Sequence, residues 1–185
     1  MKTRAAVVLA TLLALAAAPA QAGAADRAEE AVFTRIAERL ALMMPVAAWK
    51  MERGAPVEDK AREAVVLDKA AEAAEAEGLS GESARPFFAA QIEAAKDIQR
   101  CWIARWEAGE ASPPAETPDL KTEIRPELIR LGAEILASIR AALDAGAGFG
   151  AESAPAFRDA VALDCLSDPS RNAILEALAG VRPAA

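Results

Sequence analysis

Apolar residues recur at helical spacing along almost all of this 185-residue chain, and this periodicity limits it to all-α folds. Val32, Ile36 and Leu40, for example, lie four residues apart and so share one helix face. Helix-favouring alanine, leucine, glutamate and arginine are abundant, and no stretch alternates apolar and polar residues as a strand would. We therefore predict a single-domain, all-α helical bundle of about six helices, at residues 26–51, 57–77, 80–106, 120–143, 151–164 and 169–178.

Proline and serine mark several of the expected helix ends. Pro45 lies inside the first predicted helix and should kink or break it, because proline lacks the N–H donor of the helical ladder. Ser80 or Ser83 should cap the third helix, with Pro86 tolerated in its first turn. Pro126 should interrupt the fourth helix near its start.

The first 22 residues have the pattern of a secretory signal peptide. Lys2 and Arg4 precede an uncharged apolar run at 5–18, and Ala20-Gln21-Ala22 forms a small-residue cleavage motif. The run is shorter than the roughly 18 residues that indicate a membrane-spanning helix, which argues against a retained anchor. We expect cleavage after Ala22 and a periplasmic or secreted location. The exported domain would be 23–185, with a site-bearing core at 30–126 and a C-terminal helical part at 127–185.

Charge and missing residue types exclude several classes of function. Removal of Lys2 and Arg4 would change the 21 basic and 28 acidic residues to 19 and 28, a net charge of −9. A chain so acidic is not expected to bind nucleic acid or, after signal cleavage, a membrane surface. It has no histidine and no tyrosine, so it lacks the usual general base, the His-activated nucleophiles and the commonest zinc ligand. If the protein is an enzyme, we expect a reaction without metal or cofactor.

Two groups of charged residues have regular helical spacing. Arg39 and Lys50 lie eleven residues apart, about three helical turns, and should project from one face. Asp59, Arg62 and Glu63 share a face at i, i+3 and i+4. The spacing of the second group also occurs on solvated helix faces, so a binding role and a surface role both fit it.

The third predicted helix adds an amide, Gln99, at the end of the segment QIEAAKDIQ. An unpaired polar group in so apolar a stretch would be costly, which favours a binding role for Gln99, as for Arg39 and Lys50. Cations and an amide without a nucleophile suit a small polyanion whose chemistry needs only correctly placed charge.

Cys101 and Cys165 are the only cysteines. In an oxidising compartment such a pair can form a disulfide. A buried thiol is the alternative for Cys101, which lies in an apolar helical stretch, because the sequence does not show whether the two Cα atoms come within bonding distance. Both interpretations stay open on the sequence alone.

The segments RLALMMPVAAWK, PVEDKARE and QIEAAKDIQ, taken in this order and followed by a tryptophan, resemble the all-helical chorismate mutases, specifically the secreted class. The resemblance covers residues 39–106 well and 119–125 more loosely. It implies a type II chorismate mutase fold. It also implies an isomerase that converts chorismate to prephenate by an intramolecular [3,3] rearrangement. Chorismate would be the small-molecule partner, and no cofactor is implied.

The resemblance assigns binding roles to four cations. Arg39 would hold a substrate carboxylate as a bidentate fork, and Lys50 would contact both a carboxylate and the ether oxygen. Arg62 would order the carboxylate end. Arg125 matches the remaining arginine of the family and would reach the site after the proline-rich connector. Arg39 and Lys50, with Gln99, would form the catalytic set.

The other implied roles belong to an amide and two carboxylates. Gln99 would donate its N–H to the ether oxygen. Glu63, together with Asp59, would accept from the ring hydroxyl and position the cations. Position 95 is alanine, where the family often has a hydroxyl. Lys96 could point into the site or into solvent, and the expectation is that it points to solvent or to the rim of the site.

Two other functions stay open at this stage. An isochorismate-pyruvate lyase of the same fold would use similar cations on a similar dianion, although the signal peptide and the length beyond a three-helix subunit favour the mutase. A non-catalytic helical envelope protein would require only that the charged residues be solvated. The sequence does not fix the oligomeric state, and a homodimer is compatible with it.

Overall fold

The computed structural model describes residues 18–185, with side chains from Gly23 onward. In this range the chain forms seven α-helices, one π-helical turn and one 3₁₀ turn, and no strand beyond an isolated bridge. The elements are α1 (Ala18–Ala41), α2 (Met43–Glu52), α3 (Lys60–Ala76), α4 (Gly81–Glu107), η1 (Leu120–Ile124), α5 (Arg125–Asp144), η2 (Ala151–Ser153), α6 (Ala154–Ala160) and α7 (Asp168–Ala179). The predicted all-α bundle is confirmed. Most of the predicted signal peptide lies outside the described residues.

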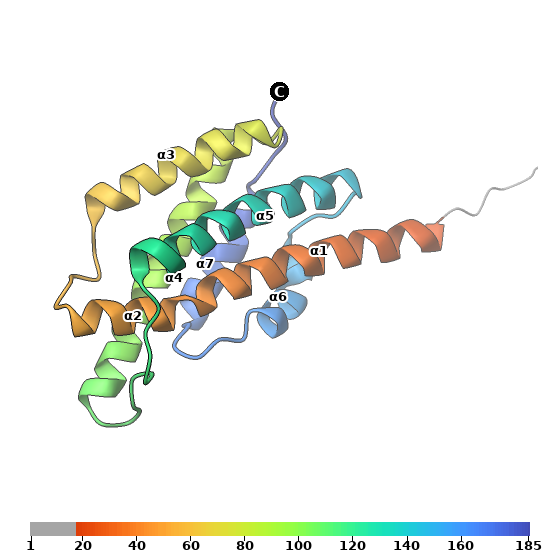
Figure 1. Ribbon diagram of the computed structural model, residues 1–185. Helices are drawn as coiled ribbons and strands as arrows, with labels where there is room; N and C mark the ends of the chain where they lie inside the picture. The colour runs from red at the N-terminus through yellow and green to blue at the C-terminus, as the bar shows by residue number, and fades with distance from the viewer. Residues whose placement is uncertain (1–17) are drawn as a thin grey trace, which may run out of the picture.

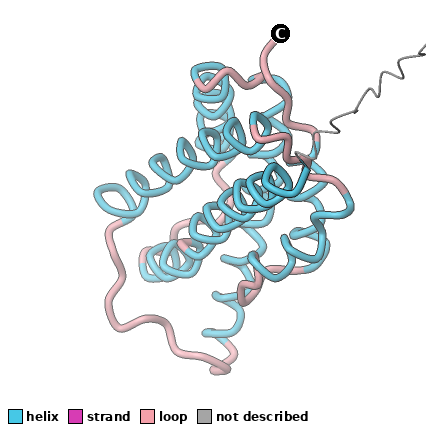
Figure 2. Tube along the Cα trace, turned by 90° about the vertical axis from the view of Figure 1, so that its right-hand side faces the viewer, coloured by secondary structure: helices cyan, strands magenta, loops and turns pink. Residues whose placement is uncertain are grey.

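The helices are arranged around α4, which crosses the middle of the bundle (Figure 1). It packs against α2, α3 and α7, while α1 runs antiparallel along α5 and also contacts α6. Phe33 of α1 packs edge-on against Phe157 of α6, with ring centroids 5.0 Å apart. Figure 2, turned by 90°, shows that the longer loops run along the outside of the helices. No helix within residues 18–185 has the length and apolarity needed to cross a bilayer.

The predicted first helix is divided at Leu42, and it also begins earlier than residue 26. α1 ends at Ala41 and α2 follows directly from Met43 (Figure 1). Pro45 explains the position of the break, because a proline ring clashes with the carbonyl four residues earlier in a regular helix, here that of Ala41. The expected break is therefore confirmed, and the two ends of the segment RLALMMPVAAWK lie on different helices.

Side-chain caps set the starts of α3 and α4. Asp59 Oδ1 accepts the backbone N–H of Arg62 at 3.0 Å, so α3 begins three residues later than predicted. The Ser80 hydroxyl accepts the backbone N–H of Ser83 at 3.3 Å, which makes Ser80 the cap of α4. The expected place of Pro86 is therefore wrong: it is the sixth residue of α4 and lies beyond the first turn.

The interruption predicted near Pro126 is the π-helical turn η1, which leads directly into α5. Asp119 caps η1, and its Oδ1 accepts the backbone N–H groups of Thr122 and Lys121 at 2.9 and 2.8 Å. These hydrogen bonds, chiefly the one from Thr122, lower the pKa of Asp119 to about 2. The capped turn thereby fixes the start of α5 at Arg125.

Two tethers hold the C-terminal part of the chain against α4. A disulfide joins Cys101 of α4 to Cys165 in the loop after α6, with Cα atoms 5.6 Å apart. The bridge is therefore the alternative that the structure shows. Near the chain end, the backbone N–H of Ser80 donates to the Arg182 carbonyl at 2.8 Å, which keeps the C-terminus beside the turn between α3 and α4 (Figure 1).

The helix α3 is only lightly anchored in the core. Its buried residues are Ala70 and Ala74, whereas α4 has twelve buried residues. Because burial of large apolar side chains provides most of the packing free energy, α3 contributes little to the core. It serves mainly as one wall of the site.

Candidate active site

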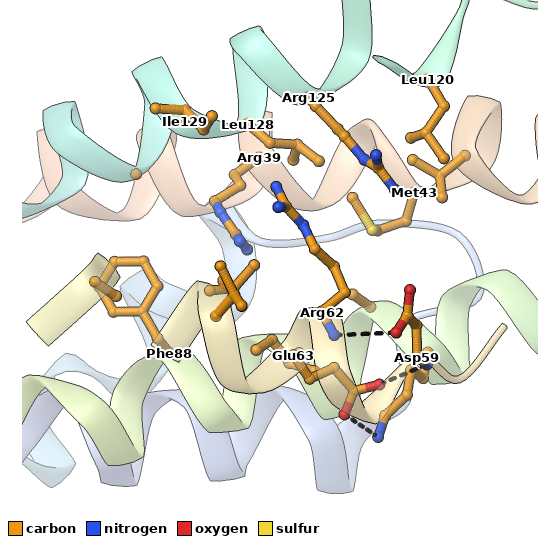
Figure 3. Close-up of a pocket in the computed structure, with 18 of the residues that line it drawn as sticks. Arg39, Met43, Asp59, Arg62, Glu63, Phe88, Leu120, Arg125, Leu128 and Ile129 are labelled. Carbon is orange, nitrogen blue, oxygen red and sulfur yellow. Dashed lines mark hydrogen bonds and ion pairs between the residues drawn. The ribbon is translucent and has the colours of Figure 1, made fainter. Parts of the chain in front are cut away.

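A cavity of about 580 Å³ lies between α1, α2, α3, α4 and α5. Figure 3 shows labelled side chains from several of these helices pointing into this space. The structure brings all of the predicted site residues to the cavity lining, namely Arg39, Lys50, Asp59, Arg62, Glu63, Gln99 and Arg125.

Three guanidinium groups face this cavity from three different helices. Arg39 extends from α1, Arg62 from α3 and Arg125 from α5 (Figure 3). Within residues 18–185 no carboxylate oxygen lies within 4.0 Å of a side-chain nitrogen of any of the three. Like charges that converge without counter-charges repel each other. An anion with more than one carboxylate would relieve this repulsion.

Arg39 is the most buried of the cations, with 7% of its surface exposed. Its Nη1 donates to Oε1 of Gln91 at 3.3 Å, and its guanidinium carbon lies 5.8 Å from the centre of the Phe88 ring. Burial lowers the pKa of Arg39 to about 10. Its Nε has no hydrogen-bond partner among the described residues. Arg39 is thus a desolvated cation that retains unused donor capacity.

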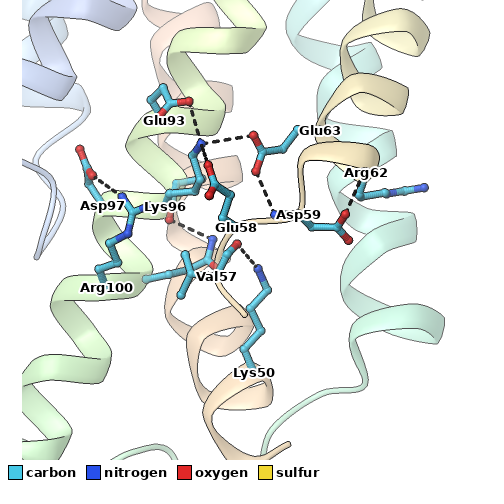
Figure 4. A network of polar contacts seen from close by, with 12 residues as sticks. Lys50, Val57, Glu58, Asp59, Arg62, Glu63, Glu93, Lys96, Asp97 and Arg100 are labelled. Carbon is cyan, nitrogen blue, oxygen red and sulfur yellow. Dashed lines mark hydrogen bonds and ion pairs between the residues drawn. The ribbon is translucent and has the colours of Figure 1, made fainter. Parts of the chain in front are cut away.

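Lys50 of α2 is half-buried and also lines the cavity. Its Nζ donates to the carbonyl of Val57 at 2.7 Å, which links α2 to the loop before α3 (Figure 4). Burial lowers the pKa of Lys50, although the nearby carboxylates of Asp59 and Glu63 partly oppose this shift. An ammonium has three N–H donors, so two are left for a ligand.

Gln99 is buried in α4 and presents one weakly engaged N–H. Its Nε2 donates to the Ala95 carbonyl at 2.9 Å and lies 3.6 Å from the sulfur of Met43. Because a thioether is a weak acceptor, the second N–H is available to a ligand oxygen. The Oε1 of Gln99 has no partner within residues 18–185.

The two predicted carboxylates are engaged with the N-terminus of α3. Asp59 caps this helix, and its own backbone N–H donates to Oε1 of Glu63 at 3.1 Å. This reciprocal arrangement satisfies donors that a helix start leaves unpaired. It also holds both acidic side chains beside Lys50 and Arg62 (Figure 4). Among residues 18–185 no group of three or more Cys, Asp or Glu side chains is arranged to hold a metal ion.

The expectation that Lys96 points to solvent or to the rim is wrong. Only 7% of its side chain is exposed, and its Nζ lies 2.8 Å from Glu93 and 3.2 Å from Glu63 (Figure 4). A third carboxylate, from Glu58, lies 3.8 Å away. The pKa of Lys96 is raised, chiefly by the hydrogen bond to Glu93. Carboxylates from α4, from the first turn of α3 and from the loop before it thus supply the counter-charges of this ammonium.

Apart from position 95, the apolar lining of the cavity was not predicted as part of the site. Phe88, Ile92 and Ala95 of α4 all line it. Val65 and Ile129 line it from α3 and α5, and are 47% and 66% exposed. Each lies three or four residues after a site arginine, and this spacing was the available signal.

The fold and the site define a single-domain, all-α protein with a cationic cavity for a small anion. The sequence profile of the chorismate mutase type II family matches residues 21–100. The chain is 33% identical over 147 residues to a monofunctional chorismate mutase of Enterobacter agglomerans, covering 78% of each chain. It is 38% identical over 104 residues to the secreted chorismate mutase of Yersinia pestis. This match spans 56% of the chain and 55% of that relative.

Solved structures give the same result over more of the fold. The crystal structure of secreted chorismate mutase from Yersinia pestis matches with a TM-score of 0.73 and 30% identity, covering 82% of this chain and 97% of that one. A chorismate mutase from Burkholderia thailandensis matches with a TM-score of 0.65 and 32% identity, covering 84% and 99%. The chain belongs to the chorismate mutase type II family. The profile match includes every predicted site residue except Arg125.

Proposed function

We propose that this protein converts chorismate to prephenate by an intramolecular [3,3] rearrangement. The observation that carries the proposal is the convergence of three arginines without carboxylate partners, together with Lys50 and Gln99, on one cavity. Membership of the chorismate mutase type II family supports it. Chorismate is a dianion, so its two carboxylates match a site with several uncompensated cations.

The chemistry requires no nucleophile and no proton transfer, which suits a chain without histidine or tyrosine. The rearrangement breaks a C–O bond and forms a C–C bond within one molecule. The protein can assist by holding the folded, reactive conformer of the substrate. It can also stabilise the negative charge that develops on the ether oxygen as the C–O bond breaks.

The individual roles follow from the donors that each side chain has free. Arg39, Arg62 and Arg125 would bind the carboxylates, with Arg39 supplying charge from the most desolvated position. Lys50 and Gln99 would donate to the ether oxygen from α2 and α4. These two donors face charge that grows in the transition state, so their contribution is mainly to kcat.

The carboxylates have a supporting part in this proposal. Glu63 and Asp59 each accept a backbone N–H in the N-terminal turn of α3. Part of their acceptor capacity is therefore already used, and the rest is left for the ring hydroxyl of the substrate. Their charge partly opposes the lowering of the Lys50 pKa by burial and so favours the charged ammonium. We therefore assign them the positioning of Lys50 and the acceptance of the ring hydroxyl.

We further propose that the protein is exported and acts in the periplasm after cleavage behind Ala22. The basic start, apolar run and cleavage motif support this, as do relatives named secreted chorismate mutases. Cleavage would leave α1 starting at Gly23 and would remove no residue of the cavity lining. The intact mass of protein recovered from the periplasm tests the position, because a mature form that begins elsewhere contradicts it.

A direct assay tests the activity. Purified protein is mixed with chorismate, and both the loss of chorismate absorbance and the formation of prephenate are measured. A parallel reaction with isochorismate distinguishes a lyase, which would release salicylate and pyruvate. Absence of prephenate formation by folded protein would refute the proposal, and turnover of neither compound would favour the non-catalytic alternative.

A further inference from the structure

Behind the cavity wall, Arg39 has a buried partner that does not itself line the cavity. Gln91 of α4 is completely buried, and its Oε1 accepts from Nη1 of Arg39 at 3.3 Å. The two residues are 52 positions apart in the sequence. An amide in this position is unusual for packing alone, because its Nε2 has no acceptor within residues 18–185. An unpaired buried donor costs free energy, so some other advantage must favour the amide.

The chemistry of the amide indicates this advantage. A buried arginine is ordinarily paired with a carboxylate, which fixes its position but also neutralises it. Gln91 offers one neutral acceptor, and the Phe88 ring covers the guanidinium from another side at 5.8 Å. Both contacts restrict Arg39 while leaving its positive charge uncompensated. The lowered pKa of Arg39 is consistent with burial without a counter-charge.

We propose that Gln91 is a positioning residue that holds the Arg39 guanidinium in place without neutralising it, so that its charge remains available to a ligand carboxylate. The inference rests on the proposed function only in that Arg39 binds a carboxylate of the substrate. It predicts that a carboxylate at position 91 would bind Arg39 in competition with the ligand. A neutral, apolar replacement would remove an anchor without adding a competitor.

The test compares Gln91→Glu and Gln91→Met with Ala104→Glu, which adds the same charge on an exposed part of α4. For chorismate turnover, we expect Gln91→Glu to raise KM at least about tenfold with a smaller fall in kcat. Arg39 contacts a group that is already charged in the ground state, so its loss weakens binding more than the chemical step. Gln91→Met should raise KM by less than Gln91→Glu, and Ala104→Glu should match the wild type.

Calorimetric binding of a bicyclic dicarboxylate transition-state analogue provides a second measurement that does not depend on turnover. Wild-type protein that binds the analogue but does not turn over chorismate would refute the proposed function while leaving this inference testable on affinity. A folded Gln91→Glu variant with KM and analogue affinity within twofold of wild type would overturn the inference. If Gln91→Glu does not fold, Gln91→Met is the test. A folded Gln91→Met variant with wild-type KM and wild-type affinity for the analogue would likewise overturn the inference.

Discussion

The Nζ of Lys96 lies 3.2 Å from a carboxylate oxygen of Glu63, and this contact joins α4 to the first turn of α3 (Figure 4). Glu63 is in turn bonded to the backbone N–H of Asp59, so a single buried ammonium supports the turn that presents Arg62. The position of α3 at the site therefore depends on Lys96, a cation that α4 supplies.

We predict that Lys96→Met destabilises the protein. Removing the ammonium leaves the partly buried Glu63 without its counter-charge, and a loss of this kind typically costs about 1–3 kcal/mol. Because the pKa of Lys96 is raised, the stabilisation is fully present below the ordinary lysine pKa of 10.5 and is lost only as the pH rises through the higher value of the folded state. The measurement is urea unfolding at neutral pH.

Lys69→Met is the matched control for this change. It removes a lysine from a pair with Glu72 in which both side chains are mostly exposed, and such pairs contribute little. A midpoint for Lys96→Met no lower than that of Lys69→Met would show that the Lys96 contacts do not stabilise the start of α3.

Lys50→Ala should be among the most damaging single substitutions, with the loss mainly in kcat. Removing one donor aimed at developing charge typically costs about 10²–10³ in rate. Arg39→Ala should raise KM as well, because its partner is already charged in the free substrate. Steady-state kinetics on chorismate measure both effects. Lys60→Ala, which removes an exposed charge outside the cavity lining, should be close to wild type. Near wild-type kcat in folded Lys50→Ala protein would contradict the assigned role.

Gln99→Glu should make the activity depend on pH in the acidic range. The wild-type amide donates N–H at any ordinary pH, whereas a carboxyl group donates only when protonated. The variant should therefore work at about pH 5 and lose activity as the pH rises through the pKa of the new carboxyl group. Proximity to Lys50 would lower that pKa and burial would raise it, so the direction of the change is the prediction. Equal activity at acidic and alkaline pH would show that position 99 does not donate to the ether oxygen.

The wild-type rate should be nearly flat between about pH 5 and 8 and should fall in alkaline solution. Burial lowers the pKa of Arg39 to about 10 and also lowers that of Lys50 below 10.5. Both side chains must be charged to bind and stabilise the substrate, so activity decreases as the pH approaches these values. The dependence of kcat/KM on pH measures this alkaline decrease, and circular dichroism at each pH verifies that the protein is folded. A decrease of kcat/KM with its midpoint near neutral pH would mean that another group controls the rate.

Reduction of the Cys101–Cys165 disulfide should lower the melting temperature while leaving activity at 25 °C largely intact. The bridge closes a loop across 64 residues, for which the chain-entropy model gives about 4 kcal/mol of stabilisation. Neither cysteine lines the cavity, so the site should persist in the reduced protein. Thiol titration of unreduced, denatured protein should find no free thiol. A double Cys101→Ser, Cys165→Ser variant should melt at the same temperature with and without reductant.

Helix boundaries in this chain depend on local contacts, whereas the surroundings of some site residues depend on contacts between distant segments. The Ser80 cap and the break at Pro45 act through neighbours within four residues, and the sequence predicted both. The Asp59 cap is equally local, but it was missed, and the predicted helix began three residues too early. The surroundings of Lys96 could not be predicted in this way. Its partner Glu63 lies 33 residues away, and only the packing of α3 on α4 brings the two together.

The site residues were predictable for a different reason. A chain with few buried polar groups must have a use for each of them, so Arg39 and Gln99 stood out against apolar helices. Gln91, equally buried, received no role because its partner belongs to a distant helix. The exposed Ile129 was missed because its place in the cavity lining depends on where η1 directs α5, which its spacing from Arg125 alone does not show.

The light anchoring of α3 has a consequence for how this protein can change over evolutionary time. Arg62, Glu63 and Val65 all line the cavity from a helix that buries only two small side chains. Substitutions on this helix can therefore alter the shape and charge of the site at little cost to the core, which α1, α4 and α5 provide. Among the residues that line the cavity, those on α3 are therefore the ones whose substitution disturbs the buried apolar core least.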